Sequence, residues 1–270
     1  MDVTAVVVVT GCGGMGEAIA RRLASGRTVV LADFSGEQLA RTSAQLEALG
    51  HVVHPVRTDV ASAADVDALA RSAAQLGPIR AVVHTAGMSP VQATSEQIVA
   101  VDVLGTAHVL DAFEAHVEPG TVAVCIASMA GTMMPVDADL LRMFATTPTA
   151  ELAALPALDP TKLDPGIAYA LAKRANQVRV EAASVAWGRR GGRVVSISPG
   201  VIATPMGRQE LDGPFGDGMR AMVEASGTRR LGTPDDIAAV VEFLVSPAAS
   251  FITGTDVLVD GGVVAAMHTQ

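Results

Sequence analysis

The chain has few aromatic residues and few cysteines. Aromatic side chains make up 3% of the 270 residues, with one tyrosine and one tryptophan, and only Cys12 and Cys125 carry thiols. Two cysteines cannot make a zinc site by themselves, so we interpret both as buried free thiols in a reducing compartment. The six histidines lack His-Glu-x-x-His spacing. The sequence therefore predicts no metal site.

Positive charge and long apolar runs are also missing. The net charge of −9 and the pI near 5.1 argue against a nucleic-acid partner, whose binding depends on a basic face. No apolar stretch reaches the ~18 residues that span a bilayer. The N-terminus has no basic region or cleavage site, and Asp2 carries the wrong charge for a signal peptide. We expect a cytoplasmic protein with no membrane partner.

Regular hydrophobic periodicity is what the chain does have. Half of its residues are hydrophobic, and β-branched apolar runs alternate with amphipathic stretches. This alternation predicts an α/β protein with a parallel sheet covered on both faces, in one domain over residues 1–270. The expected strands are 4–10, 28–33, 52–57, 80–85, 121–127, 193–198 and 256–260, and the expected helices are 14–25, 36–49, 63–76, 94–117, 167–189 and 234–246.

A glycine-rich turn joins the first expected strand to the first helix. Without a Cβ, Gly11 can form the tight turn, Gly13 or Gly14 lets the backbone approach a pyrophosphate, and Gly16 lets the helix pack closely on the strand. The helix that begins near Met15 offers N–H groups and partial positive charge to phosphates. This pattern predicts a dinucleotide site.

Asp33 ends the second expected strand, about 20 residues after the glycine turn, as a dinucleotide-binding fingerprint requires. Its carboxylate would accept hydrogen bonds from the adenosine ribose and repel a 2′-phosphate, and no Arg or Lys immediately follows it to bind one. The sequence therefore favours NAD over NADP. The alternative is an aspartate that caps the turn before Ser35-Gly36.

The only tyrosine, Tyr169, stands four residues before Lys173, which places the two side chains together on a helix. A fixed ammonium favours the phenolate and can bring a tyrosine, with an ordinary pKa near ~10, into the working range of a base. The alternative is a chance pair on an amphipathic surface.

With these residues the chain resembles the short-chain dehydrogenase/reductase family over nearly its whole length. Further segments match in order: His84-Thr85-Ala86-Gly87, Ile126 to Gly131, Ser198 to Met206, Arg230 to Ala238, and Phe251 to Gly254 with Val259 to Gly262. The resemblance implies a single Rossmann-like, doubly wound sheet of about seven strands. It also implies a cofactor site of Gly11, Gly14, Met15, Gly16, Asp33, Phe34, Asp59, Val60, Ala86, Gly87, Tyr169, Lys173, Pro199, Ile202 and Thr204.

The resemblance also implies the chemistry. Tyr169 would exchange a proton with an alcohol or carbonyl while the nicotinamide exchanges a hydride. Lys173 would lower the pKa of the tyrosine and hold the nicotinamide ribose, and Ser128 would bind the substrate oxygen. Asp102 stands where the family has a catalytic asparagine. It would either accept a hydrogen bond from a proton-relay water or supply charge to the tyrosine–lysine pair; the alternative is a purely structural helix residue.

The chain departs from the family's pattern in two more places. The glycine loop is one residue shorter than usual, and the stretch between Ser128 and Tyr169 is longer, with an insert near 132–165. A branch resembling hydroxysteroid dehydrogenase/carbonyl reductases carries a comparable insert. We expect helices near 137–145 and 149–155 in it.

The insert and the segment near 204–230 are expected to decide the substrate. Methionines and leucines in the insert favour an apolar, steroid-like or terpenoid secondary alcohol, but they could equally close a small core. Its acidic residues, Asp137, Asp139, Asp159 and Asp164, also make a cationic substrate conceivable. A second function is open too: an NAD-binding regulatory protein of the same fold, with weak or no catalysis.

The family usually pairs subunits through the helices at 94–117 and 167–189, beside which the insert enters. The apolar C-terminal segments, 234–246, 257–259 and 263–266, offer another surface. We expect a homodimer or homotetramer that uses the C-terminal face.

Overall fold

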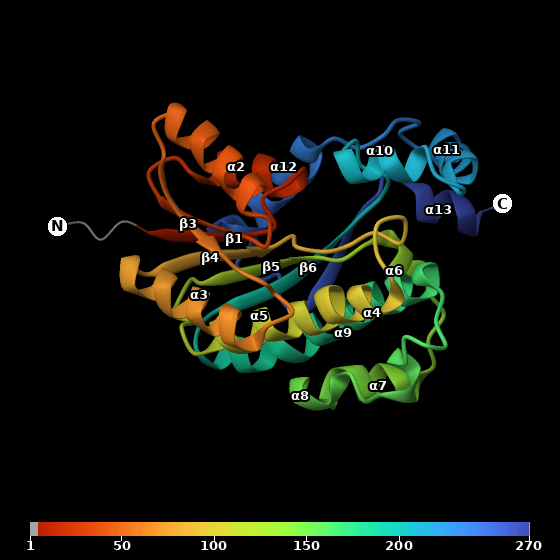
Figure 1. Cartoon of the computed structure of the whole chain (residues 1–270), viewed down its shortest axis with the longest axis horizontal. Helices are drawn as coiled ribbons and strands as arrows, with labels where there is room; N and C mark the ends of the chain where they lie inside the picture. Colours follow the sequence, from red (N-terminus) through yellow and green to blue (C-terminus); the bar gives the residue numbers. More distant parts are fainter. Residues whose placement is uncertain (1–4, 270) are drawn as a thin grey trace.

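Seven short segments form one parallel sheet in the computed structural model, which describes residues 5–269 (Figure 1). The sheet order is β3-β2-β1-β4-β5-β6-β7, so the chain reverses its direction of winding between β1 and β4. This confirms the predicted doubly wound fold; the predicted strand start at residue 4 lies outside the described residues. The strands are β1 (Val6–Thr10), β2 (Thr28–Asp33), β3 (Val52–Arg57), β4 (Ile79–His84), β5 (Val122–Ile126), β6 (Arg193–Pro199) and β7 (Thr255–Val259).

Helices cover both faces of the sheet because its central strands are apolar on both sides. One core lies beneath α1 (Met15–Leu23), α2 (Gly36–Ala48) and α12 (Pro234–Val245). The other lies beneath α3 (Ala63–Leu76), α5 (Gly105–Glu114) and α9 (Pro165–Arg189), and it contains the only tryptophan, Trp187. The edge strand β3 is mostly exposed and contains Pro55, which an edge tolerates.

Side-chain caps explain why the helices begin where they do. The hydroxyls of Ser35, Ser62 and Thr94 accept hydrogen bonds from the first turns of α2, α3 and α4 (Ser95–Ile98), and Thr233 forms a capping box with Asp236 on α12. Each such cap contributes about 1 kcal/mol of stability. The predicted helix starts consequently agree with the structure to within two residues.

The predicted helix 94–117 is interrupted by a π-helical turn, η1 (Val99–Leu104), between α4 and α5. At its end the N–H of Gly105 donates to the carbonyl of Ala100, five residues back. A Cβ at Gly105 would lie 2.8 Å from Cγ2 of Val60, so this turn packs closely on the loop after β3. Asp102 is on the turn and is fully buried.

The insert forms α7 (Ala138–Thr146), α8 (Thr149–Leu152) and the 3₁₀ turn η2 (Pro156–Leu158), which follow α6 (Met129–Met133). Phe144, Leu152 and Leu158 are fully buried in a third core, against residues of η1 and α9. In Figure 1, α7 and α8 lie on the far side of α9 from the sheet. The sequence left two possibilities for the apolar residues of the insert, a surface for an apolar substrate or a small core. These three residues close a small core.

One side chain of α9 fastens the insert to the main body. The guanidinium of Arg179 donates to the carbonyls of Phe144 and Thr147, at 3.2 and 2.9 Å, and to the hydroxyl of Thr149 at 3.0 Å. That hydroxyl donates in turn to the carboxylate of Asp111 on α5 at 2.5 Å. The insert thus belongs to the same packed unit as α5 and α9.

A fourth core closes the end of the molecule at the right of Figure 1, around α10 (Pro205–Leu211), α11 (Gly216–Ala225) and α13 (Val263–His268). Val263 and Val264 are buried in it, so the expectation that 263–266 presents an apolar surface is wrong for these two residues. The large apolar side chains exposed near the C-terminus are Phe243, Phe251, Leu258 and Met267, and Phe251 lies next to the 3₁₀ turn η3 (Pro247–Ala249).

Candidate functional site

The glycine turn lies at the carboxyl end of β1, against the end of β4. Gly11 has a φ of 82°, and a Cβ there would lie 2.6 Å from the nitrogen of Ala86. A Cβ at Gly16 would lie 1.8 Å from the carbonyl oxygen of Gly11, so α1 can approach the turn only with glycine here. Among the described residues, no side chain caps the N-terminus of α1, where Met15 is its first residue. Its N–H groups therefore suit the pyrophosphate of a dinucleotide.

Asp33, at the end of β2, organises this turn. Its carboxylate accepts hydrogen bonds from the N–H of Cys12 at 2.7 Å and from the N–H of Ser35 at 2.8 Å. The next residue, Phe34, is exposed, and the guanidinium of Arg57 lies 5.6 Å from its ring centre. Arg57 pairs with Asp33 in the β2–β3 register. The sequence shows no cation beside Asp33, but the fold brings one from the neighbouring strand.

Asp59 and Val60 follow β3 on the same rim. The carboxylate of Asp59 accepts the N–H of Ala61 at 2.9 Å, and Val60 is buried against the π-helical turn. Ala86 and Gly87 follow β4. A Cβ on Gly87 would lie 2.6 Å from Oδ1 of Asp102 and 3.1 Å from Nζ of Lys173, so the backbone here runs directly beside those two groups.

Lys173 and Asp102 form an ion pair at 2.7 Å, and both side chains are buried. The other carboxylate oxygen of Asp102 accepts the N–H of Met88 at 3.0 Å, and Nζ of Lys173 also lies 3.5 Å from the carbonyl oxygen of Ile126. Burial raises the pKa of Asp102, although Lys173 opposes the shift. Burial is also the largest influence on Lys173 and disfavours its ammonium, but the charge and hydrogen bond of Asp102, together with Tyr169 and Cys125, outweigh it and the pKa of Lys173 is raised.

Tyr169 lies on the first turns of α9, with Nζ of Lys173 5.4 Å from its ring centre. Ser128, which caps α6 at the end of β5, is a hydrogen-bond partner of the phenol. Burial raises the pKa of Tyr169; Lys173 and Ser128 lower it, whereas Asp102 and Glu210 raise it. Lys173 thus acts on this pKa in the expected direction, but burial, the largest cause, leaves the pKa of Tyr169 above its ordinary value, and the Asp102 carboxylate adds to the rise.

The segment after β6 faces the glycine turn. Pro199 ends the strand, Ile202 pairs with Gly232 in an isolated bridge, and Thr204 caps α10 by accepting the N–H of Gly207 at 3.0 Å. A Cβ at Gly14 would lie 2.9 Å from Cγ2 of Thr204. The fold thus brings the predicted residues from the ends of β1, β2, β3, β4, β5 and β6 to one rim of the sheet.

Sequence reasoning missed three residues near this rim. Glu210 on α10 is a partly buried carboxyl whose pKa is raised by burial and lowered by a hydrogen bond with Ser89 and by Lys173. Ser89, in the loop after β4, is fully buried. His84 is buried between Thr10 and Thr106. No spacing links Glu210 or Ser89 to the tyrosine, so only the fold could reveal them.

The four acids of the insert do not gather at the site. Asp137 and Asp164 cap α7 and α9, and Asp139 and Asp159 pair with Arg142 and Lys162. Each of the four aspartates thus has a structural role as a helix cap or in an ion pair, and a cationic substrate is not needed to account for them.

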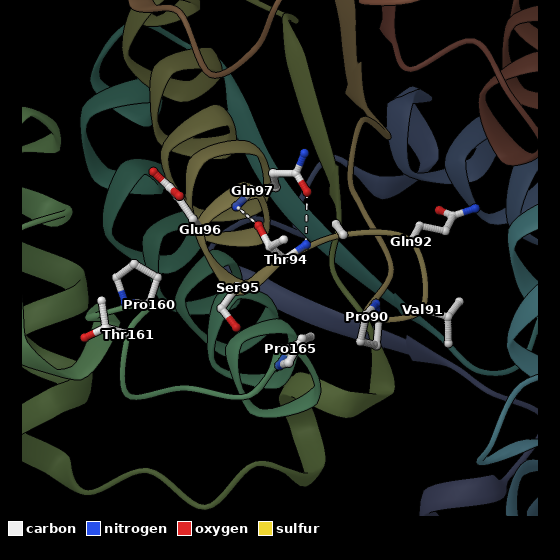
Figure 2. Close-up of a pocket in the computed structure, with 11 residues that line it drawn as sticks. Pro90, Val91, Gln92, Thr94, Ser95, Glu96, Gln97, Pro160, Thr161 and Pro165 are labelled. Carbon is white, nitrogen blue, oxygen red and sulfur yellow. Dashed lines mark hydrogen bonds between the residues drawn. The ribbon is translucent and has the colours of Figure 1, made fainter.

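A shallow cavity of about 620 Å³ lies between the loop before α4 and the end of the insert (Figure 2). Figure 2 shows Thr94 and Gln97 bonded to each other on one wall and Pro160 and Thr161 on another. None of Ser128, Tyr169 and Lys173 lines it. The cavity is therefore distinct from the cluster of Ser128, Tyr169 and Lys173.

Among residues 5–269, no helix is long and apolar enough to cross a membrane, and no cluster of three or more His, Cys, Asp or Glu residues could hold a metal ion.

Comparison with known proteins gives concordant matches. Residues 5–138 match the family described as short chain dehydrogenase, and residues 162–264 match the family described as enoyl-(acyl carrier protein) reductase. The chain is 37% identical to the short-chain dehydrogenase/reductase bsc3 of Alternaria brassicicola, over 96% of this chain and 95% of that protein. It is 28% identical to the 3-alpha-hydroxysteroid dehydrogenase/carbonyl reductase of Comamonas testosteroni, over 97% and 98%. A solved short-chain dehydrogenase/reductase from Brucella melitensis, titled glucose/ribitol dehydrogenase, superposes with a TM-score of 0.76 at 26% identity, covering 97% of each chain.

Proposed function

Since the chain belongs to the short-chain dehydrogenase/reductase family, whose matched members are oxidoreductases of alcohols and carbonyls, we propose that it interconverts a secondary alcohol and a ketone with NAD. The observation that carries this proposal is the cluster of Ser128, Tyr169 and Lys173 at the rim that also holds the glycine turn. NAD would supply the hydride acceptor or donor at its nicotinamide.

The cofactor residues of this chain fit a dinucleotide. The uncapped start of α1 and the turn at Gly11 suit the pyrophosphate, and Asp33 would accept hydrogen bonds from the adenosine ribose. Phe34, Asp59 and Val60 would border the adenine, and Thr204 and its neighbours would close over the nicotinamide. Arg57 is the residue that could oppose a preference for NAD, but its guanidinium is stacked on Phe34 and donates to the carbonyl of that residue.

Proton transfer would fall to Tyr169. In oxidation its phenolate takes the proton of the alcohol, and in reduction its phenol returns one to the carbonyl oxygen. Ser128 donates to the same substrate oxygen and orients it. Lys173 stabilises the phenolate, while Asp102 limits that stabilisation by pairing with the ammonium.

The fourth core, beside the cluster, supports an apolar substrate. It joins Met129 and Met133 to Met219 and Met222 of α11, and such methionine-rich surfaces adapt to bulky apolar ligands. The relative described as a hydroxysteroid dehydrogenase/carbonyl reductase is in keeping with a steroid-like or terpenoid alcohol. Glu210 is the one acid that acts on the tyrosine from this side, and it would accept a hydrogen bond from a second polar group of the substrate.

The proposal extends to location and organisation. One domain with a substrate-side segment at 204–230 acts in the cytoplasm, which is in keeping with the two free thiols, Cys12 and Cys125. Burial raises the pKa of Cys125 to about 12 and also raises that of Cys12, so neither thiol is a nucleophile at neutral pH.

The test is to titrate the purified protein with NAD and with NADP, then to follow reduced nicotinamide absorbance with a panel of apolar secondary alcohols at alkaline pH. Tyr169→Phe should keep NAD affinity and lose at least ~10³-fold in turnover. Tight NAD binding with no turnover of any alcohol or ketone in the panel would favour the regulatory alternative. Near-parental turnover by Tyr169→Phe would show that the base is a different group.

A further inference from the structure

His84 stands between two threonines in the centre of the fold. Nδ1 of His84 lies 2.7 Å from the hydroxyl oxygen of Thr10 on β1, and Nε2 lies 3.1 Å from the hydroxyl oxygen of Thr106 on α5. The Thr106 hydroxyl donates to the backbone carbonyl of Asp102 at 2.8 Å. All four residues are buried. A continuous chain of hydrogen bonds therefore leads from the first strand to the residue that pairs with Lys173.

The direction of each bond follows from the number of protons available. The Thr106 hydroxyl has one proton, and the carbonyl of Asp102 can only accept it, so Nε2 of His84 must donate to Thr106. Burial, with a contribution from Lys173, lowers the pKa of His84 to about 3, so the ring is neutral and its Nδ1 accepts a proton from Thr10. His84 is thus fixed as the Nε2–H tautomer.

The acceptor at the end of this chain lies in the π-helical turn. A π turn adds one residue to a helix and is maintained only where its surroundings stabilise it. Here the turn directs the Asp102 side chain toward Lys173 and the N–H of Met88. If the turn relaxed to α-helix, the residues on either side would change their relative rotation and the carboxylate would leave Lys173.

We propose that His84 is a positioning residue: through Thr106 it holds the π-helical turn that presents the Asp102 carboxylate to Lys173. The consequence for catalysis rests on the proposed function, but the ion pair, the hydrogen-bond chain and the ionisation of Tyr169 do not. The charged groups that act on Tyr169 are Lys173 from α9, Asp102 from η1 and Glu210 from α10. Displacing Asp102 alone leaves the ammonium less compensated and favours the phenolate.

The sequence provides a direct reporter. Tyr169 is the only tyrosine, so the ultraviolet difference absorbance of tyrosinate reports its ionisation without cofactor, substrate or turnover. His84→Asn places its amide near the former Nδ1 and loses the donor to Thr106, whereas His84→Gln can reach Thr106 with its own N–H. Thr106→Val removes the hydroxyl at nearly constant shape and serves if His84→Asn does not fold.

The tyrosinate titration is run on wild type, on these three variants, and on each of them in an Asp102→Asn background. We expect His84→Asn and Thr106→Val to lower the midpoint by roughly half a pH unit, about threefold in ionisation constant, and His84→Gln to retain the parental midpoint. In the Asp102→Asn background all midpoints should coincide. Equal midpoints in the wild-type background, with only a lower thermal stability, would overturn the proposal. So would shifts that persist without the Asp102 carboxylate. The titration requires no turnover. A loss of turnover in any of these variants would therefore bear only on the proposed function.

Discussion

Asp102→Asn tests how the ion pair controls the tyrosine. The change removes one negative charge from the site while keeping a side chain of the same shape. Because Asp102 raises the pKa of Tyr169, its neutralisation should lower that pKa and leave Lys173 free to favour the phenolate. The acid limb of the pH–rate profile for alcohol oxidation, where phenolate is the active form, should move to lower pH.

The size of the shift can be worked out from two distances. Oδ1 of Asp102 is 2.7 Å from Nζ of Lys173, and this Nζ is 5.4 Å from the centre of the Tyr169 ring. The carboxylate oxygen is therefore within about 8 Å of the ring, where two unit charges interact by about 2 kcal/mol at an effective dielectric constant of ~20. That energy corresponds to about 1.5 pH units. Tyr169 is partly open to solvent, so we expect a shift of about one unit.

The assay has two readouts. Tyrosinate absorbance gives the ionisation of Tyr169 in the free protein, and kcat/KM as a function of pH gives the group that limits oxidation. Asp67→Asn is the matched control, because it removes the same charge from the exposed face of α3. A midpoint that is unchanged in Asp102→Asn, or that rises, would refute the electrostatic reasoning and favour a carboxylate that only anchors a relay water.

Three further predictions concern the cofactor, the core and the surface. NAD should bind at least ~10-fold more tightly than NADP, about 1.4 kcal/mol, and Asp33→Ala should reduce this ratio in equilibrium titrations; equal affinities for the parent would contradict the role of Asp33. The pKa of His84, about 3 in the fold against 6.5 for a free imidazole, means that folding excludes a proton below pH 6.5. His84 therefore lowers the free energy of unfolding as pH falls, by roughly 2 kcal/mol between pH 6.5 and 5, and has no such effect above pH 6.5. Chemical denaturation of His84→Gln should accordingly show a weaker pH dependence than the parent over this range. Phe251, fully exposed beside the edge strand β7, should lie in a subunit interface; light scattering should show at least a dimer at micromolar concentration, and Phe251→Asp should weaken it, whereas a monomeric parent would exclude the interface.

The sequence predicted the sheet and most helices because their signals are local. Strands such as Val6–Thr10 and Thr28–Asp33 are short apolar runs rich in β-branched residues, and α12 begins at a threonine cap followed by proline. The helices of the 204–230 segment were not predicted, since Pro205–Leu211 and Gly216–Ala225 are short and their apolar faces are completed by α13. The π-helical turn was not predicted either, because its cause lies in contacts with Val60 and His84 from other parts of the chain.

The site shows the same division between local and distant information. The sequence alone was enough to predict the pairing of Tyr169 with Lys173 and the position of Asp33 at the end of a strand. The offset of Lys173 by Asp102 was not, because the distance between them depends on how the turn at 99–104 packs against α9. Arg57 reaches Phe34 only through strand pairing, and Glu210 reaches the tyrosine only through the placement of α10.

The packing of the insert on α9 has a consequence for dilute protein. If a second molecule covered this face of the helix, mass action would make that coverage depend on concentration. Here Phe144, Leu152 and Leu158 cover the face from within the same chain, and Arg179 secures them. The burial of this face therefore does not depend on protein concentration. Dilution that separates subunits at any other surface leaves this face of α9 buried, and the residues that carry Tyr169 and Lys173 keep their support.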